Sequence, residues 1–71
     1  MALIYYVFEC NLTELDHTPT DEKIKFCCSN VRWASLKEEI ERGERLIDPH
    51  SIKKIYETFD RNEARSMATE F

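Results

Sequence analysis

Alternation of apolar and polar side chains marks two strands in the first part of the chain. Residues 2–12 read ALIYYVFECNL, and residues 22–29 read EKIKFCCS. Side chains two positions apart share one face of a strand, and β-branched and aromatic residues suit a pleated surface. One apolar face would therefore carry Ile4, Tyr6, Phe8, Cys10 and Leu12 together with Ile24, Phe26 and Cys28. The polar connection between the segments predicts a turn and an antiparallel hairpin.

A helical period replaces the alternation after residue 34. Ser35-Leu36-Lys37-Glu38 is a capping-box pattern, with Ser35 as N-cap and Glu38 at the third helical position. Leu36 and Ile40 begin an apolar stripe at helical spacing. Gly43, the only glycine, is a residue type at which helices commonly end. We expect a first helix over about 35–46.

A second helical period begins at Asp48-Pro49. Asp is a favoured N-cap and Pro a favoured first helical residue. The apolar positions that follow recur at i, i+3, i+4 and i+7, namely Ile52, Ile55, Tyr56 and Phe59. This spacing predicts a second amphipathic helix over about 49–68, which the polar stretch Asp60-Arg61-Asn62 could interrupt.

The order strand, strand, helix, helix predicts a single small α+β domain over residues 1–71. The two helices would cover the apolar face of the hairpin. Both strands would be edges, and an isolated two-stranded sheet is barely stable. We therefore expect an edge to be paired, either with a second copy in a homodimer or with a strand of another protein.

Charge and composition mostly exclude functions. The chain has 14 acidic and 10 basic side chains and a net charge of −4. Direct nucleic-acid binding needs a basic protein surface, and so does attraction to an anionic membrane. Neither nucleic acid nor a membrane is therefore expected as a partner. No signal-peptide pattern is visible, and three cysteines make an odd number for a closed disulfide framework. A reducing cytoplasmic location fits best.

The cysteines and histidines do not have the spacing of a metal site. The candidate ligands are Cys10, His17, Cys27, Cys28 and His50. Structural zinc sites usually place cysteines two to four residues apart, so that both thiolates converge on one ion. Adjacent residues on a strand point to opposite faces, which separates Cys27 from Cys28. Cys10 and Cys28 could instead be neighbours across the hairpin as small buried thiols. We expect no metal and no cofactor.

Cys27 is the one thiol with a chemical environment of interest. It shares the more polar strand face with Lys23 and Lys25, and nearby positive charge lowers the pKa of a thiol. A catalytic thiol also needs a general base and an oxyanion site. Only His17 and His50 could supply the base, and no glycine-rich turn is present. We expect no catalytic residues and no enzyme; a small zinc- or thiol-dependent protein using Cys27 is the second alternative.

Acidic and aromatic side chains supply candidate partner-binding residues. Carboxylates cluster on the first predicted helix, where Glu38/Arg42 and Glu41/Arg45 form i,i+4 pairs. Such a run is usually a solvated helix face, and its sharper interpretation is an acidic docking surface. Trp and Tyr are enriched at binding hot spots. The candidates are Tyr5, Trp33, Glu38, Glu41 and Glu44.

Parts of the chain resemble the DWNN domain, a ubiquitin-like β-grasp domain found in certain RING-finger proteins. The similarity spans about residues 1–60 and lies in the opening MALIYYVF, Phe26 ten residues before Leu36-Lys37, and Lys54-Ile55-Tyr56. The resemblance implies a strand at 52–58 and a ubiquitin-like adaptor role in RNA processing or the ubiquitin pathway. The chain departs from that family at Cys27-Cys28, where the family has Asp-Gly, and lacks a last strand.

The function that these observations favour is non-enzymatic protein–protein interaction. Size and open strand edges suit a small regulatory or inhibitory protein that binds another protein directly, including virus-encoded modulators. The ubiquitin-like adaptor is the alternative.

Overall fold

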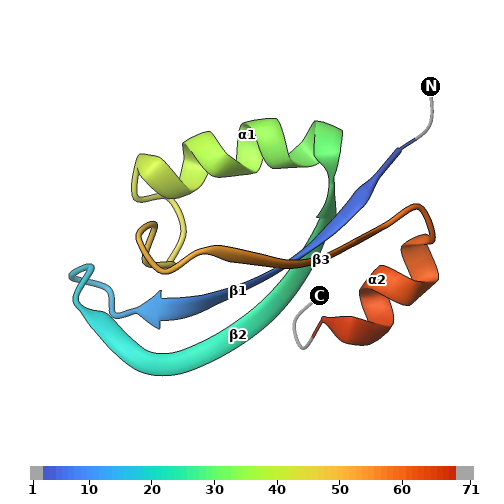
Figure 1. The fold of residues 1–71 in the computed structure, drawn as a ribbon. Helices are drawn as coiled ribbons and strands as arrows, with labels where there is room; N and C mark the ends of the chain where they lie inside the picture. The colour runs from blue at the N-terminus through green and yellow to red at the C-terminus, as the bar shows by residue number, and fades with distance from the viewer. Residues whose placement is uncertain (1–2, 69–71) are drawn as a thin grey trace.

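Five elements make up the fold of the protein in the computed structural model, which describes residues 3–68 (Figure 1). In chain order they are β1 (Tyr5–Thr13), β2 (Pro19–Ser29), α1 (Asn30–Glu41), β3 (Lys53–Thr58) and α2 (Arg61–Met67). The α+β class is confirmed. The predicted strand at 2–12 begins at Ala2, which lies outside the described residues, and the predicted strand at 22–29 lies within β2.

The sheet has three strands rather than two, in the order β2-β1-β3. β1 pairs antiparallel with β2 along the hairpin and antiparallel with β3 on its other side. The two edge strands therefore run parallel to each other, and α1 connects them across the central strand. A short turn closes the hairpin, where the Glu14 amide donates to the Thr18 carbonyl.

The face of the sheet under α1 carries the aromatic core. Phe8 and Phe26 are opposite each other in the register of β1 and β2, and their rings stack at 5.2 Å. Trp33 of α1 stacks on Phe8 at 4.2 Å. Three α1 side chains at i, i+3 and i+7 make the helical contribution to this side, Trp33, Leu36 and the buried Ile40. The sequence placed the apolar face of the hairpin correctly.

The second helix covers the opposite face, which corrects the expectation that both helices share one face. Figure 1 shows α1 on one side of the sheet and the short α2 on the other. Val7, between the α1-facing residues Tyr6 and Phe8, is fully buried, and so is Ala64 of α2. A three-stranded sheet with one helix on each face results, because β1 is apolar at odd as well as even positions near its start.

The predicted helix over 49–68 is wrong in its first half. Residues 53–58 form β3, and only residues 61–67 are helical. Asp48 and Pro49 form a turn, in which the Asp48 carboxylate accepts from the His50 amide, rather than a helix start. The strand lies where the resemblance to the DWNN domain implies one. α2 begins at Asp60, whose carboxylate accepts from the amides of Asn62 and Glu63.

The first helix begins and ends earlier than predicted. Its N-cap is Ser29, whose hydroxyl accepts from the Arg32 amide, and not Ser35. Its last residue is Glu41 and not one near residue 46: Arg42 is the C-cap, and Gly43, the residue type at which helices commonly end, follows with a φ of 79°. Among the described residues, neither helix is long and apolar enough to cross a membrane.

Candidate functional site

Two hollows adjoin along the outer edge of β2. One, of about 380 Å³, lies toward α2, and the other, of about 260 Å³, lies toward α1. Both are lined by Cys27, Cys28 and Arg32, so the two hollows are neighbours on either side of β2. Four of the five arginines of the chain line these hollows, Arg32, Arg45, Arg61 and Arg65. The edge of β2 is thus locally basic in a protein whose net charge is −4.

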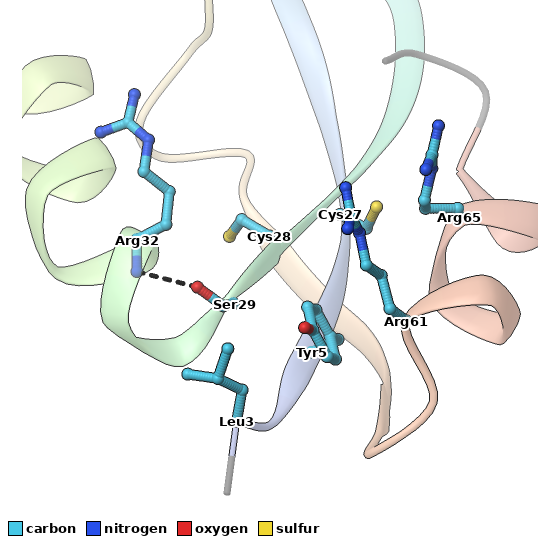
Figure 2. A pocket seen from close by; sticks show the side chains of 8 residues that line it. All are labelled: Leu3, Tyr5, Cys27, Cys28, Ser29, Arg32, Arg61 and Arg65. Atoms are coloured by element: carbon cyan, nitrogen blue, oxygen red, sulfur yellow. Dashed lines mark hydrogen bonds between the residues drawn. The ribbon is translucent and has the colours of Figure 1, made fainter. Parts of the chain in front are cut away.

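The hollow toward α2 combines a thiol, an aromatic ring and two guanidinium groups. Figure 2 shows Cys27 projecting from β2 toward Arg61 and Arg65 of α2, with Tyr5 of β1 beside them. The arginines are four residues apart, so they share one side of the helix. Within residues 3–68, neither guanidinium makes an ion pair or a hydrogen bond.

The hollow toward α1 has an apolar lining. Its apolar side chains come from β2, from α1 and from the segment after α1: Phe26, Cys28, Leu36 and Ile47. The remaining side chains that line it are Cys27, Arg32 and Arg45. We call this hollow the apolar groove.

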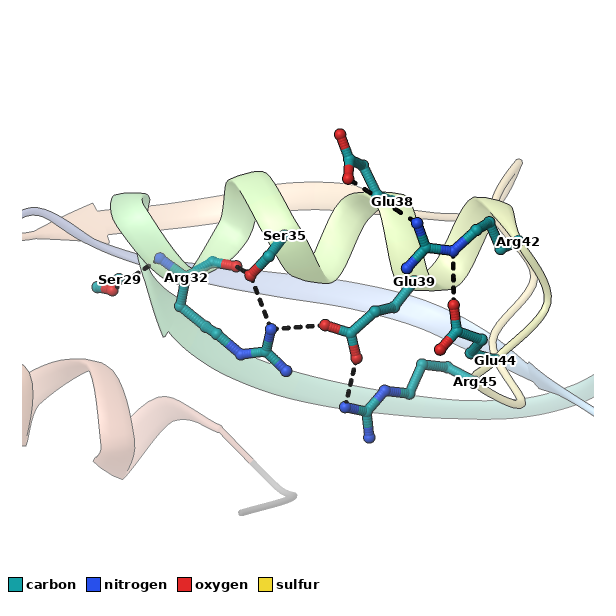
Figure 3. A network of polar contacts seen from close by, with 8 residues as sticks. All are labelled: Ser29, Arg32, Ser35, Glu38, Glu39, Arg42, Glu44 and Arg45. Carbon is teal, nitrogen blue, oxygen red and sulfur yellow. Dashed lines mark hydrogen bonds and ion pairs between the residues drawn. The ribbon is translucent and has the colours of Figure 1, made fainter.

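A carboxylate bridges the two arginines at the apolar groove. Glu39 accepts from Arg32 at 2.7 Å and from Arg45 at 2.8 Å, on the side of α1 that faces β2 (Figure 3). The hydrogen bonds from Arg32 and Arg45 lower the pKa of Glu39 to about 2. One carboxylate thus holds two cations in place, and this triad keeps a net positive charge.

Burial makes two of the three thiols poor nucleophiles. Desolvation raises the pKa of Cys10 to about 11, and it also raises the pKa of Cys28 to about 11. The thiolate is the reactive form of cysteine, so both side chains stay protonated at neutral pH. Cys27 points away from Cys28, toward the arginines of α2 (Figure 2).

The register does not bring cysteines together. Cys28 pairs with Tyr6 and Cys10 pairs with Ile24, so the expected neighbourhood of Cys10 and Cys28 is wrong. Phe8 and Phe26 lie between them, and four residues of strand separate them by roughly 13 Å. No cluster of three or more His, Cys, Asp or Glu side chains arranged to hold a metal occurs within residues 3–68.

Neither histidine lies near Cys27. Cys27 pairs with Val7 toward one end of the sheet, whereas His17 lies in the hairpin turn at the other end, against Gly43. His50 lies two residues after Asp48. The Asp48 amide donates to the Asn11 carbonyl, which lies near the same end of the sheet as the hairpin turn. Neither histidine is therefore placed to act as a general base for the Cys27 thiol.

The predicted partner-binding residues fall into different environments. Tyr5 lines the α2-side hollow, and Trp33 is half-buried in the aromatic core. Glu38 and Glu44 both contact Arg42, and Glu44 lies beyond the end of α1. Glu41 is exposed, and its predicted pairing with Arg45 does not form because Arg45 contacts Glu39 instead.

Arg61 and Arg65, the arginines of the α2-side hollow, were missed by the sequence analysis. Arg61 lies in the stretch Asp60-Arg61-Asn62, which was expected to be able to interrupt a longer helix, and Arg65 follows that stretch. One signal could have found them: Asp60 followed three residues later by Glu63 resembles a capping box, which would have started a helix at Arg61 and set the two arginines on one face.

Comparisons with known proteins add no relative. A scan against models of protein families gives no match, and neither do searches of curated protein sequences and of solved structures. A function for this chain therefore rests on the chemistry of its own side chains.

Proposed function

We propose that this protein is a non-enzymatic protein-binding module, a small regulatory or inhibitory protein that docks a partner on the edge of β2. The observation that carries the proposal is the pair of hollows that flank this edge. One has a largely apolar lining, and the other is lined by Arg61 and Arg65 of α2. An edge strand presents unpaired N–H and C=O groups that another strand can bond, and flanking pockets hold the alternate side chains.

β2 suits this role better than β3 does. β2 has 11 residues, and its register with β1 is regular from Lys23 to Ser29. β3 has six residues, begins with Lys53 and Lys54, and carries a bulge opposite Val7 and Phe8. Short length and bulges are features by which proteins protect an edge from pairing. Lysines occur on both edges, since β2 carries Lys23 and Lys25, and they do not distinguish the two. The open and regular edge is therefore the one that is flanked by hollows.

Charge favours a different protein over a second copy at this edge. Two β2 edges paired with each other would bring Arg61 and Arg65 of each copy toward the same junction. Like charges brought together across an interface cost several kcal/mol. A homodimer through β2 would need an anion or an additional carboxylate between the copies, which the hollows lack among the described residues.

A ubiquitin-like adaptor remains the alternative. It draws support from β3, which occupies the stretch where the resemblance to the DWNN domain implies a strand. Both functions are protein binding, and they differ in the partner.

Site-specific photo-crosslinking in cells of the source organism tests the proposal. A photoreactive residue replaces Cys27 beside the β2 edge and, in a matched variant, Ile55 on β3. We expect discrete adducts with another protein from the Cys27 position and none from the Ile55 position. Adducts from Ile55 alone, adducts with a second copy alone, or no adduct from either position would overturn the proposal.

A further inference from the structure

A strand added to β2 would continue the alternation of β2 itself. Side chains directly opposite each other across a ladder project to the same face. Cys27 projects toward α2 and Cys28 toward α1 (Figure 2). The residue of an added strand that lies opposite Cys27 would therefore enter the α2-side hollow, and its two neighbours would lie on the side of the apolar groove.

Two cationic side chains of α2 line the α2-side hollow. Arg61 and Arg65 make no ion pair within residues 3–68, and no acidic side chain lines this hollow. Glu63, on the same helix, accepts a hydrogen bond from the Tyr56 hydroxyl of β3, the edge strand away from β2. A carboxylate fits here because guanidinium groups bind carboxylates with charge-assisted hydrogen bonds.

The apolar groove calls for a different side chain. Its arginines, Arg32 and Arg45, already share Glu39. Its remaining lining comes from Phe26, Leu36 and Ile47, together with the cysteines. Burial of apolar surface in such a groove is favourable.

From these two environments we infer that the partner segment is an extended acidic strand with the order apolar, acidic, apolar. The acidic residue lies opposite Cys27 and binds Arg61 and Arg65; the apolar residues on each side of it enter the apolar groove. This inference rests on the proposed docking edge and adds the chemistry of its occupant.

Selection from a displayed library of random twelve-residue peptides tests the chemistry. We expect the selected peptides to share Asp or Glu flanked on both sides by Val, Ile, Leu or Phe. Synthetic peptides with that triplet should bind at least tenfold more tightly than the same peptides with Asn or Gln at the acidic position. Selected peptides without an acidic residue at this place, or equal affinities, would overturn the inference.

A pair of charge-matched variants assigns the acidic position to the arginines. R61Q/R65Q removes two positive charges beside Cys27, and K37Q/R42Q removes two outside both hollows, one on α1 and one at its C-cap. We expect R61Q/R65Q to weaken binding of the acidic peptides at least tenfold and to abolish their advantage over the amide peptides. K37Q/R42Q should change both affinities less than threefold. Equal losses in the two variants would mean that only the net charge of the protein matters. Circular dichroism checks that each variant folds.

Amide hydrogen exchange separates failure of the inference from failure of the proposed function. Bound peptide should slow exchange in β2 between Lys23 and Ser29 and leave β3 unchanged. Slowed exchange in β2 with no preference for acidic peptides would leave the docking edge standing and overturn the inferred chemistry. Slowed exchange in β3 alone would overturn both.

Discussion

The Phe8 ring lies against the Trp33 indole, with ring centroids 4.2 Å apart and planes inclined by 29°. This stack joins the central strand to the first turns of α1. Stacked aromatic pairs contribute roughly 0.5–1.5 kcal/mol beyond the apolar area that they bury. Phe8→Leu and Trp33→Leu should therefore be non-additive, with a coupling of about that size in a double-mutant cycle from urea unfolding.

Additive effects of the two substitutions would contradict a specific stack. Phe26 supplies the control, because its ring lies farther from Trp33, at 6.4 Å. A cycle between Phe26→Leu and Trp33→Leu should give the smaller coupling energy of the two.

Gly43 has a left-handed backbone, and a side chain there should destabilise the protein. Its φ is 79°, and a Cβ would lie 3.2 Å from Cε1 of His17. Left-handed backbone costs most L-residues roughly 1–2 kcal/mol, and Asn tolerates it better than Ala. We expect Gly43→Ala to lower the free energy of unfolding by about 1–2 kcal/mol and Gly43→Asn to lower it less, measured by urea denaturation.

The contact with His17 can be separated from the backbone effect. In a His17→Ala background, the steric part of the Gly43→Ala cost should disappear and the backbone part should remain. Complete rescue by His17→Ala would contradict the assignment to φ.

Asp60 should control the local stability of α2. Its carboxylate accepts from the amides of Asn62 and Glu63, and the helix has only seven residues. Loss of an N-cap typically costs about 0.5–2 kcal/mol. Asp60→Ala should accelerate amide exchange in α2 while exchange in β1 changes less, and Asp60→Asn, which keeps the cap, should resemble the wild type. Unchanged exchange in Asp60→Ala would mean that packing of Ala64 alone holds the helix.

Glu39 should give the protein a stability that depends on acid pH. The pKa of this carboxyl is lowered from 4.5 to about 2 by Arg32 and Arg45. A folded-state pKa below the unfolded value means that the contribution is present above about pH 4.5 and is lost as the pH falls toward about 2. The difference in urea midpoint between wild type and Glu39→Gln should therefore be constant near neutral pH and shrink over this window.

Glu41→Gln is the matched control, because Glu41 is exposed on the same helix and makes no ion pair within residues 3–68. The difference in urea midpoint between Glu41→Gln and the wild type should be small at every pH. A difference in urea midpoint between the wild type and Glu39→Gln that stays constant down to pH 2 would contradict the pairing of Glu39 with Arg32 and Arg45.

Cys27 should be the first thiol to react with an aromatic disulfide reagent near pH 8. The pKa values of Cys10 and Cys28 are raised to about 11 by burial, so both are almost wholly protonated at that pH. The thiolate is the attacking form. We expect Cys27→Ser to remove the fastest phase and Cys28→Ser to keep it; the opposite result would reverse the assignment of faces on β2.

Alternation predicted the hairpin because one face of it is continuously apolar. The same method failed for residues 53–58, and the reason lies in the bulge. Lys54 pairs with Phe8, and Tyr56 with Val7, so Ile55 is the additional residue in β3. Lys54 and Glu57 consequently share a face although they are three positions apart, and their ion pair spans 2.9 Å. Period-two alternation is lost, and the helical spacing of Ile52, Ile55 and Phe59 misled the prediction.

The candidate site was predictable only in part. Strand geometry alone separated Cys27 from Cys28, and the structure keeps that separation. The cations beside them come from elements distant in the sequence, and Arg65 is 38 positions from Cys27. Arg61 and Arg65 come close to Cys27 only because β3 completes the sheet and α2 packs on its second face. The hydrophobic pattern indicated neither of these.

The central position of β1 determines when the sheet can be completed during synthesis. β1 is made first and gains β2 as a neighbour within a few residues, but its other neighbour is made only after α1. Until residue 58 has left the ribosome, the backbone of β1 is unpaired on one side. A nascent chain of this protein therefore passes through a stage in which its most apolar strand is an open edge, and an open edge of this kind is prone to aggregation.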